Sequence, residues 1–265
     1  MSKKGKVLSS IYLILILLVV YIPIASLVVF SFNGAKGNRA SITRWDFFSF
    51  MWYERLFTDH NIGSAVMVTF QVGAIATVVS VIIGTIAAYA LSKAKKRTKS
   101  TVLNLTNIPI VTPEIITAVA LFLLFASTQL SSGFLKLCLA HISFCTPYVV
   151  ITVYPKALEI DSNCIDAARD LGATPFQVLT RVVIPQLKTG IIAGAVIAFS
   201  MSFDDFIISF FVGGSTQNLS AYIYSIKAGI NPVVNALSTI MLMVIFGKIA
   251  YDYFLKNKKK YIEED

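Results

Sequence analysis

Charged residues are scarce in this sequence. Of its 265 residues, 14% are charged and 56% are hydrophobic, whereas a soluble globular domain carries roughly 25% charged residues. The charges are also grouped between long apolar runs instead of being spread along the chain. This composition excludes an ordinary soluble domain and predicts a membrane protein. The net charge of +9 does not indicate nucleic-acid binding, which needs a basic face on a polar fold.

Residues that hold metals or form disulfides are also few. Cys138 and Cys145 lie roughly 10 Å apart along a helix, too far for a disulfide, and Cys164 stands alone. His60 and His141 belong to no ligand pattern, so the sequence assigns them no role. The phosphate-binding pattern G-x-x-x-x-G-K-S/T is absent as well. We therefore expect no metal, cofactor or catalytic residue, and a process driven by ATP needs a separate ATPase.

Six apolar runs are long enough to cross a bilayer, whose hydrocarbon core takes roughly 20 residues of helix. They cover residues 8–32, 62–92, 101–127, 133–154, 189–212 and 234–255. The sequence therefore predicts an all-α membrane protein with six transmembrane helices in a single domain. Gly190 and Gly194 have the spacing typical of close helix packing in lipid. Trp45, Trp52 and Tyr53, between the first two runs, are expected at the membrane interface.

The distribution of basic residues predicts the orientation of these spans. With six spans, three basic groups fall on one side: Lys3–Lys6, the dense cluster Lys93–Lys99, and the tail Lys256–Lys260. The loops on the other side hold basic residues diluted among acidic ones. Because Lys and Arg concentrate in cytoplasmic loops, both termini and the polar loop 156–188 are predicted to be cytoplasmic.

The polar stretch at residues 166–185 lies between the fourth and fifth apolar runs and reads DAARDLGATPFQVLTRVVIP. It predicts two short helices that are separated at Gly172, which suits the left-handed conformation after a helix end. Residues 174–177 (TPFQ) predict a capping box with proline at the first helical position. Pro185 is expected to end the second helix. This capped elbow suits the docking of another protein, although a well-capped surface loop has the same signals.

Acidic residues inside the apolar runs are the sharpest candidates for function. Asp204 and Asp205 lie in the fifth run and Glu114 in the third, and ionisable groups inside a membrane are costly and usually functional. A pathway lined by them would attract cations. Phe203 and Phe206 flank the aspartates and are placed for cation–π contact, with ordinary packing as the alternative. An early end of the fifth span, or backbone freed by a proline kink, would explain the acids without a pathway.

The spacing of residues in the polar stretch resembles the EAA loop of ABC importer permeases. The matching residues are Asp166-Ala167-Ala168, Gly172 and Val182-x-Ile184-Pro185, with Asp in place of the family's Glu. Nearly the whole chain is similar to the spermidine/putrescine permeases of this family. The similar segments are Tyr21-Ile22-Pro23 with Ser31-Phe32-Asn33, residues 52–56, 109–115, 202–206 and 235–239. Asn218-Leu219-Ser220 departs from the Leu-Pro expected there, which leaves the conformation of that outer loop open.

This resemblance implies a type I ABC importer permease fold in the bacterial inner membrane and polyamines as cargo. It implies three kinds of partner besides the lipid bilayer: two copies of an ATPase subunit, a second, related permease subunit, and an extracytoplasmic polyamine-binding protein. The ATPase would dock on Asp166, Ala167, Ala168, Gly172, Ile184 and Pro185. The cargo would pass Asp204, Asp205, Glu114, Phe203 and Phe206.

Three alternatives remain at this point. An intramembrane aspartyl protease needs two Asp that face each other from different helices, whereas Asp204 and Asp205 are predicted to be neighbours on one helix. A stand-alone secondary transporter often shows internal repeats, and it leaves the polar stretch unexplained. A permease for opines, ferric iron or another solute would share the EAA loop, so only the acidic residues and the full-length similarity favour polyamines.

Overall fold

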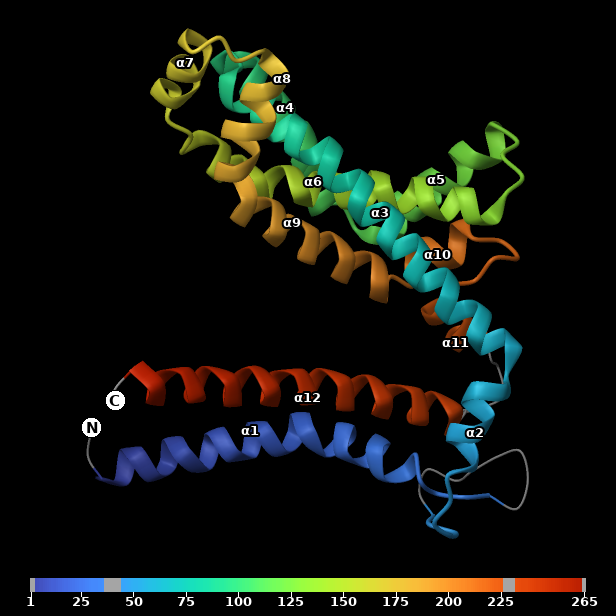
Figure 1. Cartoon of the computed structure of the whole chain (residues 1–265). Coiled ribbons are helices and arrows are strands. Elements are labelled where there is room, and N and C mark those ends of the chain that lie inside the picture. Colours follow the sequence, from blue (N-terminus) through green and yellow to red (C-terminus); the bar gives the residue numbers. More distant parts are fainter. Residues whose placement is uncertain (1–2, 36–43, 226–231, 264–265) are drawn as a thin grey trace. The chain divides into compact units, whose positions relative to one another are not determined.

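A computed structural model describes residues 3–35, 44–225 and 232–263, and it is helical over most of that length. The elements are α1 (Lys3–Phe30), α2 (Met51–Thr58), α3 (His60–Lys93), α4 (Lys96–Val111), α5 (Glu114–Ser127), α6 (Gly133–Leu158), α7 (Ser162–Asp170), α8 (Pro175–Val178), the π-helix η1 (Leu179–Val183), α9 (Ile184–Asp204), α10 (Ile207–Val212), α11 (Leu219–Ser225) and α12 (Pro232–Glu263) (Figure 1). Residues 1–63 with 226–265 form one compact unit, and residues 64–225 form a second.

Helices that are long and apolar enough to cross a membrane confirm the predicted all-α membrane protein. Within the described ranges there are five: Ser9–Phe30, His60–Lys93, Gly133–Leu158, Pro175–Asp204 and Pro232–Tyr251. A sixth span results if the bent pair α4 and α5 crosses the membrane together. The polar loop predicted at 156–188 is shorter than expected, because α6 continues to Leu158 and the next apolar helical run begins at Pro175.

The third predicted span, residues 101–127, is broken instead of continuous. Helices α4 and α5 meet at an angle of 102°. The break falls at Thr112, which is extended (φ −75°, ψ 136°) because a following proline disfavours the helical conformation. Pro113 supplies that proline, whereas Pro109 lies inside α4 without ending it. Glu114 therefore sits in the first turn of α5, where the helix dipole favours an acidic side chain.

The prediction that Pro185 ends the second helix of the polar stretch was wrong. Helix α8 continues through η1 into α9, and Pro185 lies in the first turn of α9. The π-helical turn places the N–H of Ile184 on the carbonyl of Leu179, five residues earlier. This wider turn lets the chain pass a residue that lacks an N–H without breaking the helical run. The fifth membrane helix therefore begins at the elbow itself.

The fifth predicted span, residues 189–212, ends earlier than expected. Helix α9 stops at Asp204, and Asp205 leaves the helical conformation (φ −58°, ψ 126°) before α10 begins at Ile207. The sequence predicted that the two aspartates are neighbours on one helix, and this prediction was wrong. One ends a helix and the other forms the break.

The unit that contains both ends of the chain consists of α1, α2 and α12. Helices α1 and α12 lie side by side and run in opposite directions (Figure 1). Trp52 on α2 is fully buried, and its Nε1 donates a hydrogen bond of 2.7 Å to the carbonyl of Asn33. The indole N–H of Trp52 thus finds its partner inside the protein, and the position of Trp52 relative to the membrane interface stays a prediction. Trp45 remains 45% exposed.

The second unit is built on the close contact of α6 with α9. A Cβ added to Gly194 would lie 3.2 Å from Cγ1 of Val149, and one added to Gly190 would lie 3.2 Å from Cγ of Lys156. Both glycines are buried, which confirms the predicted close packing. A Cβ on Gly84 of α3 would approach Val149 to 2.7 Å. Glycines on two helices thus bring their backbones against α6, and this packing holds the site described next.

Candidate functional site

The first half of the elbow, α7 and the turn after it, has the predicted caps. The side chain of Asp161 accepts the N–H of Asn163 at 2.9 Å and begins α7. Gly172 has a φ of +80°, and its N–H donates to the carbonyl of Arg169 at 2.8 Å. This left-handed residue ends the helix as the sequence predicted, since glycine adopts positive φ without steric cost.

The second half of the elbow begins with a complete capping box. Oγ1 of Thr174 accepts the N–H of Gln177 at 3.3 Å, and Oε1 of Gln177 accepts the N–H of Thr174 at 2.8 Å. Pro175 occupies the start of α8, where its missing N–H costs nothing. The predicted TPFQ capping box is therefore confirmed. Both ends of the elbow are held by local hydrogen bonds.

The elbow presents apolar side chains that the sequence did not single out. Ile165 and Val178 are buried and anchor it, whereas Leu171 is 89% and Phe176 is 72% exposed. Leu171 and Phe176 could have been identified as large apolar residues that do not fall on the buried face of their helices. Of the residues predicted for docking, Asp166, Ala167 and Gly172 are exposed at the elbow, Ala168 is partly buried, and Ile184 and Pro185 lie beyond η1 on the fifth membrane helix.

An acidic cavity of about 570 Å³ lies in the second unit, where the broken third and fifth spans meet α6. Its lining includes Thr112, Glu114, Tyr148, Asp204, Asp205 and Phe206. The structure therefore brings together four of the five residues predicted for the pathway. Phe203 is not among the lining residues and instead packs against Phe70 and Phe199, with ring centroids 5.3 and 5.6 Å away.

The two aspartates have different environments. Asp204 is exposed, whereas the side chain of Asp205 is fully buried. Oδ1 of Asp205 accepts the N–H of Ile208 at 3.2 Å, and Oδ2 accepts the N–H of Ser209 at 2.8 Å and its hydroxyl at 2.6 Å. Asp205 thus satisfies the first N–H groups of α10, which have no partner within the helix. The side chain of Asp204 does not cap α10, and the partly buried Glu114 contacts the side chain of Asp205.

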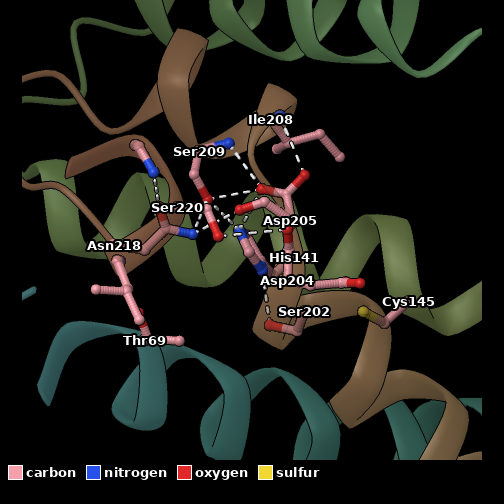
Figure 2. Close-up of polar contacts among 12 residues, drawn as sticks. Thr69, His141, Cys145, Ser202, Asp204, Asp205, Ile208, Ser209, Asn218 and Ser220 are labelled. Atoms are coloured by element: carbon pink, nitrogen blue, oxygen red, sulfur yellow. Dashed lines mark hydrogen bonds and ion pairs between the residues drawn. The ribbon is translucent and has the colours of Figure 1, made fainter. Parts of the chain in front are cut away.

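His141, which the sequence left without a role, lies at the centre of this region (Figure 2). Its ring is buried, with Nδ1 at 2.7 Å from Oγ of Ser202 and Nε2 at 3.0 Å from Oγ of Ser209. Nε2 is also 3.3 Å from Oδ2 of Asp205. The ring therefore links α6 to both sides of the break between α9 and α10. The rule that singled out the acids, that ionisable groups in membrane spans are functional by default, would also have selected His141.

Asn218, in the loop before α11, stands where the resemblance led us to expect a Leu-Pro pair. Its Nδ2 donates to the carbonyl of Asp205 and to Oγ of Ser209, each at 2.7 Å. Its Oδ1 accepts the N–H of Ala221 at 2.9 Å and caps α11. The side chain is 1% exposed. The loop is thus tied to the break in the fifth span by a buried amide, which a Leu-Pro pair could not provide.

A multi-pass helical membrane protein with broken spans around an acidic cavity, and with a capped elbow at the start of its fifth membrane helix, has the layout of a transport subunit. Residues 80–260 match the model of a family described as the binding-protein-dependent transport system inner membrane component. The chain belongs to this family of inner-membrane transport components. The resemblance to ABC importer permeases is therefore confirmed.

Two groups of relatives carry polyamine names. The chain is 34% identical to the spermidine/putrescine transport system permease protein PotC of Haemophilus influenzae, covering 91% of this chain and 93% of the relative. It is also 34% identical to the putrescine transport system permease protein PotI of Escherichia coli K12, covering 92% and 89%. Among solved structures, a bacterial ABC transporter for the acidic polysaccharide alginate matches with a TM-score of 0.72, 17% identity and coverage of 97% and 98%. That likeness concerns the fold alone.

Proposed function

We propose that this chain is a permease subunit of an ABC importer that moves the polyamines spermidine or putrescine into the cytoplasm. The observation that carries the proposal is the cavity that Glu114, Asp204 and Phe206 line together. A polyamine carries several ammonium groups on an apolar chain, which suits carboxylates and an aromatic face lining the same space. The names of the relatives support this cargo over other solutes.

The elbow is the proposed docking site of the ATPase. Asp166, Ala167 and Gly172 lie on its exposed surface, and Leu171 and Phe176 add apolar area for a protein partner. From Pro175 to Asp204 the chain forms one apolar helical run of 30 residues, about 45 Å long at 1.5 Å per residue. Movement of the elbow is thereby passed along this run to the acidic cavity. The ATPase must bind one orientation of the elbow better than the other to drive that movement.

The complete importer is proposed to contain further subunits. A second, related permease would complete the pathway, two ATPase subunits would dock from the cytoplasm, and an extracytoplasmic polyamine-binding protein would deliver the cargo. Both termini of this chain would lie in the cytoplasm, as the distribution of basic residues suggests. ATP hydrolysis belongs to the partner, so this chain acts as a transport subunit and not as an enzyme.

Uptake of labelled spermidine tests the cargo. Cells without polyamine uptake of their own would express this chain together with its second permease, its ATPase and its binding protein. We expect ATP-dependent uptake that is reduced by unlabelled putrescine or spermidine and is unaffected by opines or ferric complexes. Competition by one of the latter solutes, with no uptake of either polyamine, would assign the importer to another cargo.

A further inference from the structure

The hydrogen bonds around Ser209 determine where the protons of the buried network lie. Its hydroxyl has one hydrogen and donates it to Oδ2 of Asp205 at 2.6 Å. The amide nitrogen of Asn218 is only a donor, so Ser209 Oγ accepts from it at 2.7 Å. The third contact, 3.0 Å from Nε2 of His141, then has to be donated by the ring. His141 therefore carries a hydrogen on Nε2, the nitrogen that faces both Ser209 and Asp205.

The other ring nitrogen has a matching partner. Nδ1 of His141 is 2.7 Å from the hydroxyl of Ser202, which lies two residues before the end of α9. The hydroxyl of Ser202 can both donate and accept, so it serves Nδ1 in whichever role that nitrogen requires. One imidazole thus contacts the last turn of α9 on one side and the first turn of α10, through Ser209, on the other. The break between the two helices is held from α6 (Figure 2).

We propose that His141 is a positioning residue of the cation site. Its Nε2 donor, together with Ser209, holds the buried Asp205 carboxylate at the start of α10, so the backbone leaves α9 directly after Asp204. Asp204 is thereby kept at the cavity, while Asp205 serves the internal hydrogen bonds and not the cargo. This assignment rests on the proposed function, since it says which carboxylates meet the cargo.

The first test replaces the ring of His141 by an apolar side chain, leucine, and separately by a polar one, glutamine. We expect His141→Leu to lower spermidine uptake per molecule in the membrane by about tenfold or more, the factor that corresponds to losing a hydrogen bond to a charged group. His141→Gln should retain most of the uptake, because its amide N–H can replace the ring donor. A leucine variant with normal uptake per molecule would overturn the proposal, and so would a glutamine variant as defective as leucine.

A double-mutant cycle then tests whether His141 acts through Asp205. In the Asp205→Asn background, His141→Leu should lower uptake by less than about twofold, because residues of one network are not additive. Gly172→Ala, at the elbow, is the matched control background, in which the two effects should multiply. Multiplying effects with Asp205→Asn would overturn the proposal. If the leucine variant fails to reach the membrane, Ser202→Ala, which removes only the hydroxyl on Nδ1, takes its place in the same cycle.

Thermal unfolding of the purified chain tests the link between His141 and Asp205 independently of the proposal that the cargo is a polyamine. Unfolding needs no cargo, so the coupling between His141 and Asp205 is measurable whatever the importer carries. Coupling in unfolding with no polyamine uptake by the unmodified importer would refute the cargo while leaving the link between the two residues in place. Coupling in unfolding combined with unchanged uptake of the variants would reduce His141 to a packing residue and overturn the positioning role.

Discussion

Replacing Gly172 by valine is expected to leave the chain in the membrane at its normal level while lowering ATP-driven uptake by about tenfold or more. Gly172 has a φ of +80°, and a left-handed conformation costs an L-residue roughly 1–2 kcal/mol, with a β-branched side chain least suited to it. About 1.4 kcal/mol corresponds to a factor of ten. Apart from Gly172 and its two chain neighbours, no residue has a heavy atom within 4 Å of a Cβ built on Gly172, so the cost comes from the backbone of the elbow and not from crowding.

The matched control at this position is Gly172→Asn. Asparagine visits the left-handed conformation more readily than other residues with a side chain, so its uptake should stay close to that of the unmodified chain. Uptake of labelled spermidine and ATP hydrolysis by the assembled importer are measured together. Hydrolysis that continues while uptake falls in the valine variant indicates uncoupling at the elbow. Normal uptake by the valine variant would show that the elbow geometry does not transmit the work of the ATPase.

Neutralising both accessible acids of the cavity, by Glu114→Gln together with Asp204→Asn, is expected to lower spermidine uptake by about a hundredfold or more. Each variant removes a carboxylate that accepts a hydrogen bond from an ammonium group of the cargo, and such a bond is worth roughly 1.5–3 kcal/mol. Expression should stay normal, because Asp204 is exposed and Glu114 is partly buried. Asp204 lies outside the hydrogen bonds through His141, whereas the side chain of Glu114 contacts that network at Asp205, and the amide of glutamine can keep this contact. The loss should therefore appear in transport and not in the amount of folded protein.

The control for the cavity keeps the charge and changes only the length of the side chains. Glu114→Asp together with Asp204→Glu should retain a substantial part of the uptake that the neutral pair loses. Uptake rates are compared per molecule of chain in the membrane, with binding protein and ATPase in excess. Uptake by the neutral pair that equals that of the unmodified chain would remove the cavity from the pathway.

The elbow was predictable from sequence because its signals are local. A glycine after a helix, and Thr174 three residues before Gln177, specify hydrogen bonds that close within one turn, and the structure contains them. The break in the third span also has a local cause. Thr112 is extended because Pro113 follows it. The apolar runs likewise predicted which stretches form membrane helices, although the third and fifth of them are broken. Each of these features depends on residues that are neighbours in the chain.

The break in the fifth span was only partly predictable. Aspartate is favoured at the start of a helix, and Asp205 accepts the N–H groups of Ile208 and Ser209 at the start of α10, so an early end of the span was one of the alternatives. The contacts of Asp205 with the side chains of His141, Ser209 and Asn218 could not be predicted. These residues are up to about 77 positions apart in the sequence and meet only through tertiary packing. The continuation of the helix past Pro185 has a similar origin, since a π-helical turn in η1 accommodates it. The sequence therefore identified the acidic residues, but it did not identify the residues that give Asp204 and Asp205 different environments.

The most direct test of the proposed mechanism is the side of the membrane that the elbow faces, since a cytoplasmic ATPase can dock only there. Cys164 on α7 is exposed, whereas Cys138 and Cys145 are buried, so the native chain carries its own reporter. A membrane-impermeant maleimide would be applied to intact cells and to inside-out vesicles, with Cys164→Ser as the control for specificity. A cytoplasmic elbow predicts labelling of Cys164 in the vesicles and none in intact cells. Labelling of Cys164 in intact cells would place the elbow outside and contradict the proposed coupling to ATP hydrolysis.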